Sequence, residues 1–457
     1  MWLNYLDLYY SIFVKENIKT TRFPNGLTIL TEKMPDLRSA TLGFWFRRGA
    51  RDEPAHLNGI SHFIEHAVFK GTGKRTALDI AMETDRLGGN FDAFTMHEQT
   101  AFTIKVTDKA VPQAFELLAD MLTGPMFDKI DLEREQKVII EEMKMVEDSP
   151  EEFLGEIFQQ NFFAGSRLAL PIEGTEKTVL TFNNETTAQY HRETFLPSNL
   201  VITAAGNIEH EQIIDLAAEF FVTPASQQKS EGLPGRRLAD EMEAGRFHDS
   251  PTDIYRDGGA TKLILLKDKP GLEQTHFILA APWIDETSER RYAAHLLENI
   301  LGNGSSSRLW QKIREERGLA YSVGAGGISY RDRGVFNVFA ATSAENFEET
   351  VDLAIVEMRR IKNEAVSDEE LTLAKEQSAA NLLLSLEDSS VRAGNLAQHE
   401  ITFGRQISVD ETLQKLEQVT IDEIKNIANE FFVTESLVLT ALGNFAEKSS
   451  DIKPLEI

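Results

Sequence analysis

The chain has 457 residues, 42% of them hydrophobic and 26% charged, which is enough for two or three globular domains with sizeable cores. Its 47 Lys and Arg against 73 Asp and Glu give a net charge of −26, which argues against binding to nucleic acid or to an anionic lipid surface. Cysteine is absent, so any metal must be held by His and carboxylates.

The first segment, residues 1–16, is unusually aromatic. It lacks a basic start and a small-residue cleavage site, and Asp7 interrupts its apolar run. We interpret it as an N-terminal extension that packs or binds a partner, not as a signal peptide. No stretch approaches the roughly 18 continuous apolar residues of a membrane span. We therefore expect a cytoplasmic protein, although the absence of cysteine would also suit export.

The sequence contains one pattern of elements twice. Residues 26–46 and 261–281 share one pattern, a strand, a Pro-containing turn and a second strand. A charged stretch and a helix follow each time, with His62 in the first helix and His295 in the second, 295 − 62 = 233 positions apart. Gly71 and Gly304 keep the same offset. This internal duplication predicts two similar domains.

The boundary between the two domains is readable from composition. Residues 224–260 are rich in Gly, Ser, Pro and charge with little apolar periodicity, which predicts a linker. The domains would then be 17–223 and 261–457. Apolar residues recur at helical spacing in 131–147, 346–363 and 367–384. Because strands come in neighbouring groups with helices between the groups, we predict an α+β fold, each domain a mainly antiparallel sheet packed with helices.

The strongest chemical signal is His62-x-x-Glu65-His66. On a helix, positions i and i+4 share a face, so both imidazoles can reach one ion. Two His nitrogens suit zinc, and Glu65 can point at the open coordination position and take a proton from attacking water. This order is the reverse of H-E-x-x-H and forms a zinc class of its own. The alternative is a structural pair of histidines with no metal.

A catalytic zinc site needs a third protein ligand. Glu142 is the candidate, because Glu135 and Glu142 are seven positions apart and share one face of a predicted helix. From spacing alone, the solvated face of a charged helix is the favoured explanation for these carboxylates.

These motifs together resemble the pitrilysin/insulinase family of zinc peptidases, in particular its two-domain members of the mitochondrial processing peptidase type. The resemblance runs from Thr20 to Asn444. It is carried by these segments: GISHFIEHAVFKGT, RLGGNFDAFTMHEQT, EREQKVIIEEMKM, PIEGT and GNGSSSRLWQKIREERGLAYSV.

The resemblance implies roles for five residues. His62, His66 and Glu142 match the family's ligands of one Zn²⁺ per chain. Glu65 matches its general base, and Glu135 matches a carboxylate that supports the site from behind the ligands.

The resemblance also implies a substrate strand at residues 90–95, where an extended peptide would pair with a sheet edge. The implied substrate-binding residues are Asn90, Asp92, Ala93, Phe94 and Thr95. Asp92 stands where many members carry Asn, which puts one substrate hydrogen bond in doubt. Core packing of Phe91 and Phe94 is the alternative role for this strand.

In the second half, Arg314 and Tyr321 match the family's catalytic Arg and Tyr, which would bind substrate carbonyls and the oxyanion. The pattern His295-x-x-Glu298-Asn299 lacks a second His, and we interpret it as a relic without metal. Since the family pairs the zinc domain of one subunit with the Arg/Tyr domain of another, a homodimer with active sites completed in trans is implied.

The sequence therefore predicts a zinc metalloendopeptidase that acts on peptides or unfolded segments inside a dimer chamber. Two alternatives stay open. One is a non-catalytic structural or partner subunit of the same family, and the other is an active zinc subunit that needs a different, Arg/Tyr-bearing partner. The complete zinc set argues against the first, and the presence of Arg314 and Tyr321 argues against the second.

Overall fold

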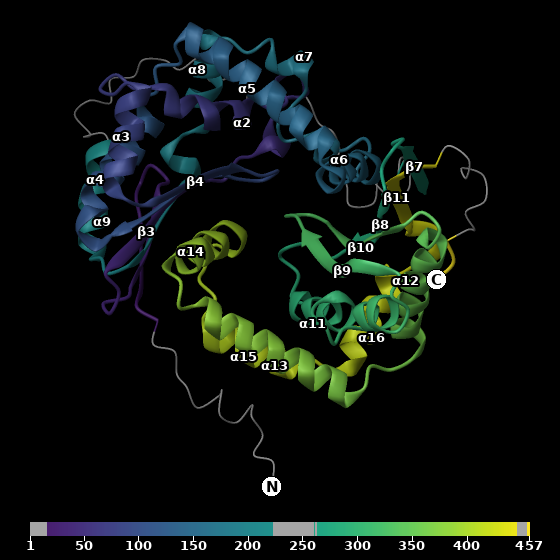
Figure 1. Cartoon of the computed structure of the whole chain (residues 1–457). Coiled ribbons are helices and arrows are strands. Elements are labelled where there is room, and N and C mark those ends of the chain that lie inside the picture. Colours follow the sequence, from purple (N-terminus) through teal and green to yellow (C-terminus); the bar gives the residue numbers. More distant parts are fainter. Residues whose placement is uncertain (1–15, 223–259, 261–262, 446–454) are drawn as a thin grey trace.

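A computed structural model describes residues 16–222, 260, 263–445 and 455–457. The extension predicted at 1–16 and the linker predicted at 224–260 fall almost entirely outside these residues. The chain forms two sheets with helices packed on them, arranged around a central region (Figure 1). Among the described residues, no helix combines the length and the apolar composition needed to cross a membrane.

The first half contains six strands and the helices that surround them. The strands are β1 (Ile18–Arg22), β2 (Thr28–Lys33), β3 (Ser39–Phe46), β4 (Asn90–Thr95), β5 (Thr100–Thr107) and β6 (Leu200–Gly206). The helices are α2 (Ile60–Ala67), α3 (Ala77–Leu87), α4 (Val111–Thr123), α5 (Lys129–Asp148), α6 (Pro150–Phe162), α7 (Glu176–Val179), α8 (Asn184–Thr194) and α9 (His210–Phe221).

The second half repeats this plan. Its strands are β7 (Ile264–Asp268), β8 (Gln274–Trp283), β9 (Ala320–Ser329), β10 (Gly334–Ser343) and β11 (Val438–Gly443). Its helices are α11 (Arg291–Gly302), the π-helical turn η8 (Trp310–Glu315), α12 (Phe347–Asn363), α13 (Asp368–Ser385), α14 (Ser389–Phe403), α15 (Val409–Gln418) and α16 (Ile421–Phe431). The helices predicted at 131–147, 346–363 and 367–384 are confirmed as α5, α12 and α13.

The two sheets share one topology, which confirms the α+β prediction. The first has the order β1-β2-β6-β3-β5-β4 and the second β7-β11-β8-β10-β9, so five strands correspond one to one. Each sheet is antiparallel except for one parallel pair, β2 with β6 and β7 with β11. The edge strands β4 and β9 occupy equivalent places in the two halves.

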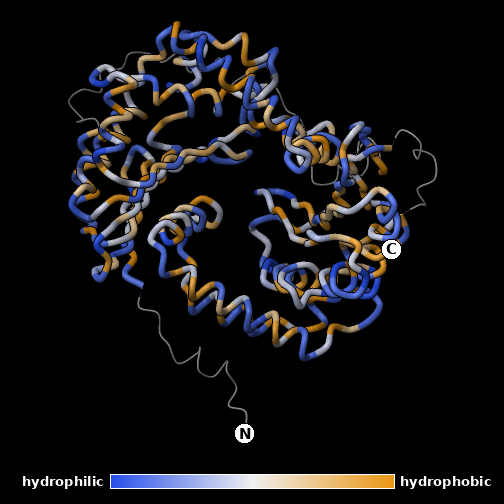
Figure 2. The backbone as a smooth tube through the Cα atoms, in the orientation of Figure 1, coloured by the Kyte–Doolittle hydropathy of each residue, from blue (hydrophilic) through white to orange (hydrophobic). Residues whose placement is uncertain are grey.

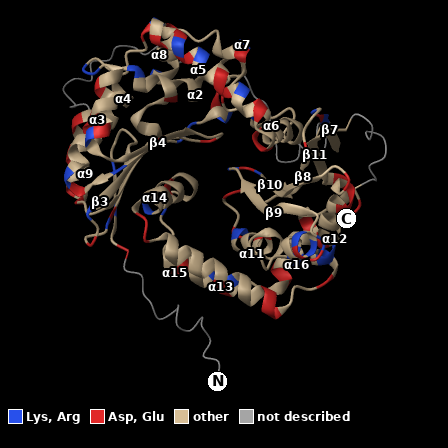
Figure 3. Cartoon of the chain, in the orientation of Figure 1, with Lys and Arg blue, Asp and Glu red and all other residues tan. Residues whose placement is uncertain are grey.

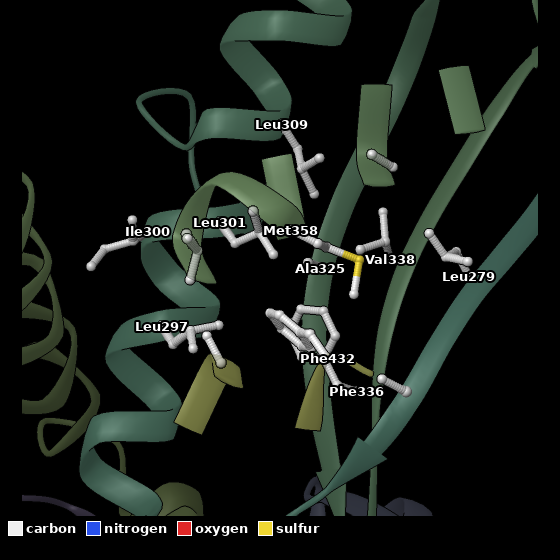
Figure 4. Packing of buried hydrophobic residues seen from close by; sticks show 14 of the residues in the cluster. Leu279, Leu297, Ile300, Leu301, Leu309, Ala325, Phe336, Val338, Met358 and Phe432 are labelled. Carbon is white, nitrogen blue, oxygen red and sulfur yellow. The ribbon is translucent and has the colours of Figure 1, made fainter. Parts of the chain in front are cut away.

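Each half has its own apolar core between its sheet and its helices. In the second half, Phe336 and Phe432 lie against Met358 and against the leucines of α11 (Figure 4). Hydrophobic and hydrophilic residues alternate along the helices, as expected for helices with one buried face (Figure 2). Charged side chains lie mainly on these helices and leave the strands largely uncharged (Figure 3).

The halves also exchange one helix each. Helix α14 of the second half packs on β2, β3 and β6 of the first sheet, where Leu396 and Ala397 meet Trp45 and Val201. Helix α6 of the first half packs on β8 and β11 of the second sheet, where Phe158 and Phe162 belong to one buried cluster with Val438. Each sheet is therefore covered on one face by a helix from the other half.

Ion pairs reinforce the junction between the halves. The Arg51 guanidinium is buried and donates two parallel hydrogen bonds to Asp332, at 2.7 and 2.5 Å, and a third to Glu98 at 2.6 Å. Asp332 lies in the turn between β9 and β10, and Glu98 lies in the equivalent turn between β4 and β5. The tips of the two hairpins are thus joined through one buried arginine.

Removal of Asp332 should destabilise this junction. We expect Asp332→Ala to lower the free energy of unfolding by about 3 kcal/mol, because the buried Arg51 charge loses its bidentate partner. Urea denaturation of the variant and wild type measures this. Glu349→Ala removes a carboxylate from an exposed pair with Arg317 and should change stability little. Equal stability of the two variants would contradict the account.

Candidate metal centre

The helix that carries the predicted zinc motif, α2, begins at a carboxylate cap. Glu53 accepts hydrogen bonds from the backbone N–H groups of Gly59 and Ser61, both at 2.7 Å. These are two of the N–H groups that a helix start leaves without partners. Glu53 is completely buried, and this burial raises its pKa to about 7 in spite of the hydrogen bonds. The cap fixes where the helix begins and therefore where its histidines point.

A close backbone approach holds the same helix end. Gly59 has φ +95°, and a Cβ there would lie 2.5 Å from the Glu173 carbonyl oxygen. Gly174 has φ +82°, and a Cβ there would lie 2.4 Å from the Asn58 carbonyl oxygen. Only glycine combines this conformation with this contact. The PIEGT segment therefore packs directly on the start of α2.

The predicted ligands come together. The Glu142 carboxylate on α5 lies 3.9 Å from His62 Nε2 and 3.6 Å from His66 Nε2. Among the described residues, these three form the group whose donor atoms, all within 4.8 Å of one another, could hold a metal ion. Donors of a tetrahedral zinc ion lie roughly 3.3 Å apart, from bonds of about 2 Å. The triangle thus has the composition of a zinc site and is somewhat wider than the donor spacing around a bound ion.

The electrostatics of the triangle suit metal binding. Burial lowers the pKa of His62 to about 3, so its imidazole is neutral and can donate a lone pair. Glu142 Oε2 is buried and accepts no hydrogen bond within the described part of the chain. A metal ion between this oxygen and the two imidazole nitrogens would give it the partner that a buried polar atom needs.

Glu135 lies behind His66, as predicted. Its carboxylate is 3.4 Å from His66 Nδ1 and 2.8 Å from Lys70 Nζ. Burial opposes ionisation of Glu135, but the hydrogen bonds from His66 and Lys70 lower its pKa overall. A carboxylate on Nδ1 leaves Nε2 of His66 free for a metal and fixes the ring orientation.

Glu65 occupies a buried place beside the ligands. Its carboxylate accepts a 2.7 Å hydrogen bond from the Thr95 hydroxyl. Burial raises the pKa of Glu65, while this hydrogen bond opposes the rise. A buried carboxylate of raised pKa next to a metal triangle has the placement of a general base.

The strand predicted for substrate is confirmed as an edge. β4 pairs with β5 at the end of the sheet order, and no other strand of the described residues pairs with its outer side. Asn90 and Asp92 are exposed, whereas Phe91 packs on Phe69 with ring centroids 5.1 Å apart. Phe94 packs on Trp45 at 5.8 Å. The strand thus combines core packing with a free backbone edge.

Arg314 and Tyr321 form a stacked unit on the second half. The Arg314 guanidinium lies 4.0 Å from the Trp310 ring centroid and 4.5 Å from that of Tyr321. It also donates to the Tyr321 backbone carbonyl at 3.1 Å. Tyr321 is 79% exposed. In the part of the chain that the structure describes, no hydrogen bond, ion pair or ring contact joins this unit to the metal triangle.

The equivalent of the zinc motif in the second half has other partners. Glu298 accepts a 2.8 Å hydrogen bond from Trp283 Nε1, and burial raises its pKa to about 7. Asn299 lies 3.3 Å from His295 and donates to Ser378 at 2.8 Å. These polar groups are bonded to one another and to neighbouring side chains.

An acidic pocket adjoins the metal triangle. The cavity has a volume of about 350 Å³, and its lining includes Val146, one turn beyond Glu142 on α5. Glu152, Glu156 and Glu173 contribute carboxylates to it. Burial, together with the charges of Glu173 and Glu147, raises the pKa of Glu156 to about 7.

Two residues of the centre were not predicted from the sequence. Glu53 and Lys70 lie outside the histidine motif and belong to no periodic pattern. The proximity of Glu53 to a glycine that precedes a helix is a weak signal, because a carboxylate near an N-terminus commonly caps it.

Comparison with known families decides the relationship. Residues 28–176 match the model described as insulinase (peptidase family M16), and residues 181–378 match the M16 inactive domain. The chain belongs to peptidase family M16. Its relatives include a protein of Streptomyces coelicolor named an uncharacterized zinc protease, 35% identical over 413 residues, which span 90% of this chain and 87% of the relative. A Bacillus subtilis protein with the same description is 33% identical over 93% of this chain and 98% of the relative.

Solved structures of other proteins have the same fold. A protease from Helicobacter pylori superposes with a TM-score of 0.82 at 19% identity and covers 94% of this chain and 100% of its own. A chain of complex III2 from Candida albicans superposes with a TM-score of 0.75 at 19% identity and covers 95% and 98%. The names of the two zinc protease relatives support a peptidase role for this M16 protein and zinc as its metal.

Neutralising Glu142 should remove the metal. We expect Glu142→Gln to lower zinc affinity by at least 10-fold, because an anionic ligand is replaced by a weakly coordinating amide. Glu141→Gln is the matched control, since Glu141 is the adjacent residue on α5 and pairs with Lys144 on the surface. Competition titration with a zinc-binding dye measures both variants. Wild-type affinity in Glu142→Gln would show that the third ligand lies elsewhere.

Proposed function

We propose that this M16 protein is a zinc metalloendopeptidase that hydrolyses peptide bonds in peptides or unfolded segments, with one zinc ion per chain. The observation that carries the proposal is the triangle of His62, His66 and Glu142 with the Glu65 carboxylate buried beside it. This arrangement would supply three zinc ligands and a general base, a set that suits metal-assisted hydrolysis.

The residues divide the chemistry between them. A zinc ion bound here would polarise the scissile carbonyl and make an attacking water more acidic. Glu65 would accept a proton from that water and pass it to the leaving amine. Glu135 would keep His66 oriented, with Lys70 holding Glu135 in place.

The β4 edge and the acidic pocket suggest how a substrate is held. An extended peptide would add to β4 by backbone hydrogen bonds, which accept almost any sequence. Asn90, Asp92, Ala93 and Phe94 would border it. The carboxylates of Glu156 and Glu173 repel each other in the neighbouring pocket, and a basic side chain would relieve this repulsion.

We further propose that the active site is completed in trans in a homodimer that encloses a chamber. Arg314 and Tyr321 make no described contact with the metal triangle of their own chain, and the Tyr321 ring is largely exposed. Arg314 and Tyr321 would therefore serve the zinc site of a second subunit. There they would bind substrate carbonyls and the developing oxyanion.

A non-catalytic subunit is the second candidate function. The observation that favours this candidate is that the chain has the same fold as a chain of complex III2, and this likeness concerns the fold alone. The metal triangle favours the peptidase, because a structural subunit has no need for a buried Glu142 Oε2 that finds no hydrogen-bond partner among the described residues.

Mixing two inactive variants tests the shared site. Glu65→Gln and Tyr321→Phe are expected to lower kcat by at least 100-fold each. When the two variants are mixed under conditions that allow subunits to exchange, activity on a fluorogenic peptide should return. One of the two sites in each mixed dimer then keeps both the Glu65 carboxylate and the Tyr321 hydroxyl.

The matched control for this experiment mixes Glu65→Gln with His62→Ala. Both substitutions lie in the zinc-binding half, so no combination restores a complete site and activity should stay at the sum of the two variants. Recovery in the control, or none in the first mixture while the wild type cleaves, would contradict completion in trans.

A further inference from the structure

Thr95, the last residue of the edge strand β4, is the most buried residue of that strand. Successive side chains of a strand point to opposite faces of the sheet. Phe91 and Ala93 pack on the apolar core of the first half, and Thr95 shares their face because it follows the same alternation. Helix α2 packs against β4 on this side. Thr95 is 9% exposed, so its side chain is directed into the protein.

The Thr95 hydroxyl reaches Glu65 from this position. The Thr95 Oγ1 to Glu65 Oε2 distance is 2.7 Å, and both residues are buried. Within the described ranges, this is the one hydrogen bond that the Glu65 carboxylate accepts from another side chain. Hydrogen bonds from a neutral donor to a carboxylate are short and strong, particularly where water is excluded.

The bond restricts a flexible side chain. Glutamate has three rotatable side-chain bonds, and the last of them turns freely between two broad minima. With Oε2 held by Thr95, the other oxygen, Oε1, is left to take a proton. A displacement of about 1 Å in a reacting group can cost about 100-fold in rate, so the orientation of this carboxylate matters.

We infer that Thr95 is a positioning residue for the general base: it orients the Glu65 carboxylate from the end of the substrate strand. This inference rests on the proposed peptidase function. It assigns the Thr95 side chain to the base, whereas the family resemblance implies that Thr95 binds substrate. Since β4 carries both the peptide-binding edge and the hydroxyl that holds the base, one strand sets the position of the base relative to the bound peptide.

The test compares Thr95→Val, Thr95→Ser and Thr100→Val with the wild type. Valine keeps the branched shape of threonine and removes the hydroxyl, whereas serine keeps the hydroxyl. Thr100 is the matched control: it is paired with Thr95 across β4 and β5, is buried, and donates to the Arg48 carbonyl at 3.0 Å, away from Glu65.

Two kinds of readout separate positioning from general damage. Crystal structures of the metal-free variants show where the Glu65 carboxylate lies, and steady-state kinetics on a fluorogenic peptide give kcat and KM separately. In Thr95→Val we expect Glu65 to leave its position and kcat to fall by about 10- to 100-fold, with KM and zinc content close to wild type. Thr95→Ser should restore both the Glu65 position and kcat, and Thr100→Val should keep them.

Other results would contradict the inference. An unmoved Glu65 and wild-type kcat in Thr95→Val would overturn the inference and leave the proposed function standing. An equal fall of kcat in Thr95→Val and Thr100→Val would also overturn it, since a general packing defect would then explain the loss. A wild type that binds zinc and cleaves no peptide would overturn the proposed function, and the inference with it.

Discussion

The contact between α2 and α5 is the constraint on which the site depends. Residues 62 and 66 share one face of α2 because they are four positions apart, and residues 135 and 142 share one face of α5 because they are seven apart. When the two faces meet, His66 lies between the two carboxylates, at 3.4 Å from Glu135 and 3.6 Å from Glu142. Neither helix can shift along the other without breaking both contacts, so the centre is assembled by helix packing.

Features around the helix pair serve to keep this register. Glu53 fixes the start of α2, and the Gly59 and Gly174 backbones lock that start against the PIEGT segment. Thr95 ties the centre to the edge strand. The free energy for holding buried carboxylates in place comes from the core of the first half, which packs on the opposite side of α2 through Phe63 and Ile64.

Duplication explains the division of labour between the halves. The two sheets keep the same strand order. Helix α6 of the first half covers the second sheet and helix α14 of the second half covers the first sheet, so each half needs the other to cover its sheet. The first half keeps two histidines on α2. The second half has Asn299 at the equivalent position, and its Glu298 is bonded to Trp283. Under the proposed function, the exposed stack of Arg314 and Tyr321 would be the contribution of the second half to catalysis.

Much of this centre could be predicted from the sequence, because its signals are local. The spacing of His62, Glu65 and His66 implies one helix face, and the spacing of Glu135 and Glu142 implies another. Their meeting is a contact between distant segments, and the family resemblance supplied it. Glu53, Lys70 and the base-directed side chain of Thr95 could not be predicted, since each acts through a contact that no periodicity records. The exchange of α6 and α14 could not be predicted either, because the sequence of an amphipathic helix does not specify which sheet the helix covers.

Zinc titration of metal-free protein tests the central claim most directly. Bound zinc and hydrolysis of an unfolded fluorogenic peptide would be measured together for the wild type and Glu65→Gln. The account predicts that wild-type activity rises with zinc and saturates at one ion per chain, whereas Glu65→Gln binds the same zinc and stays inactive. Activity that is independent of zinc, or a fully active Glu65→Gln, would contradict it.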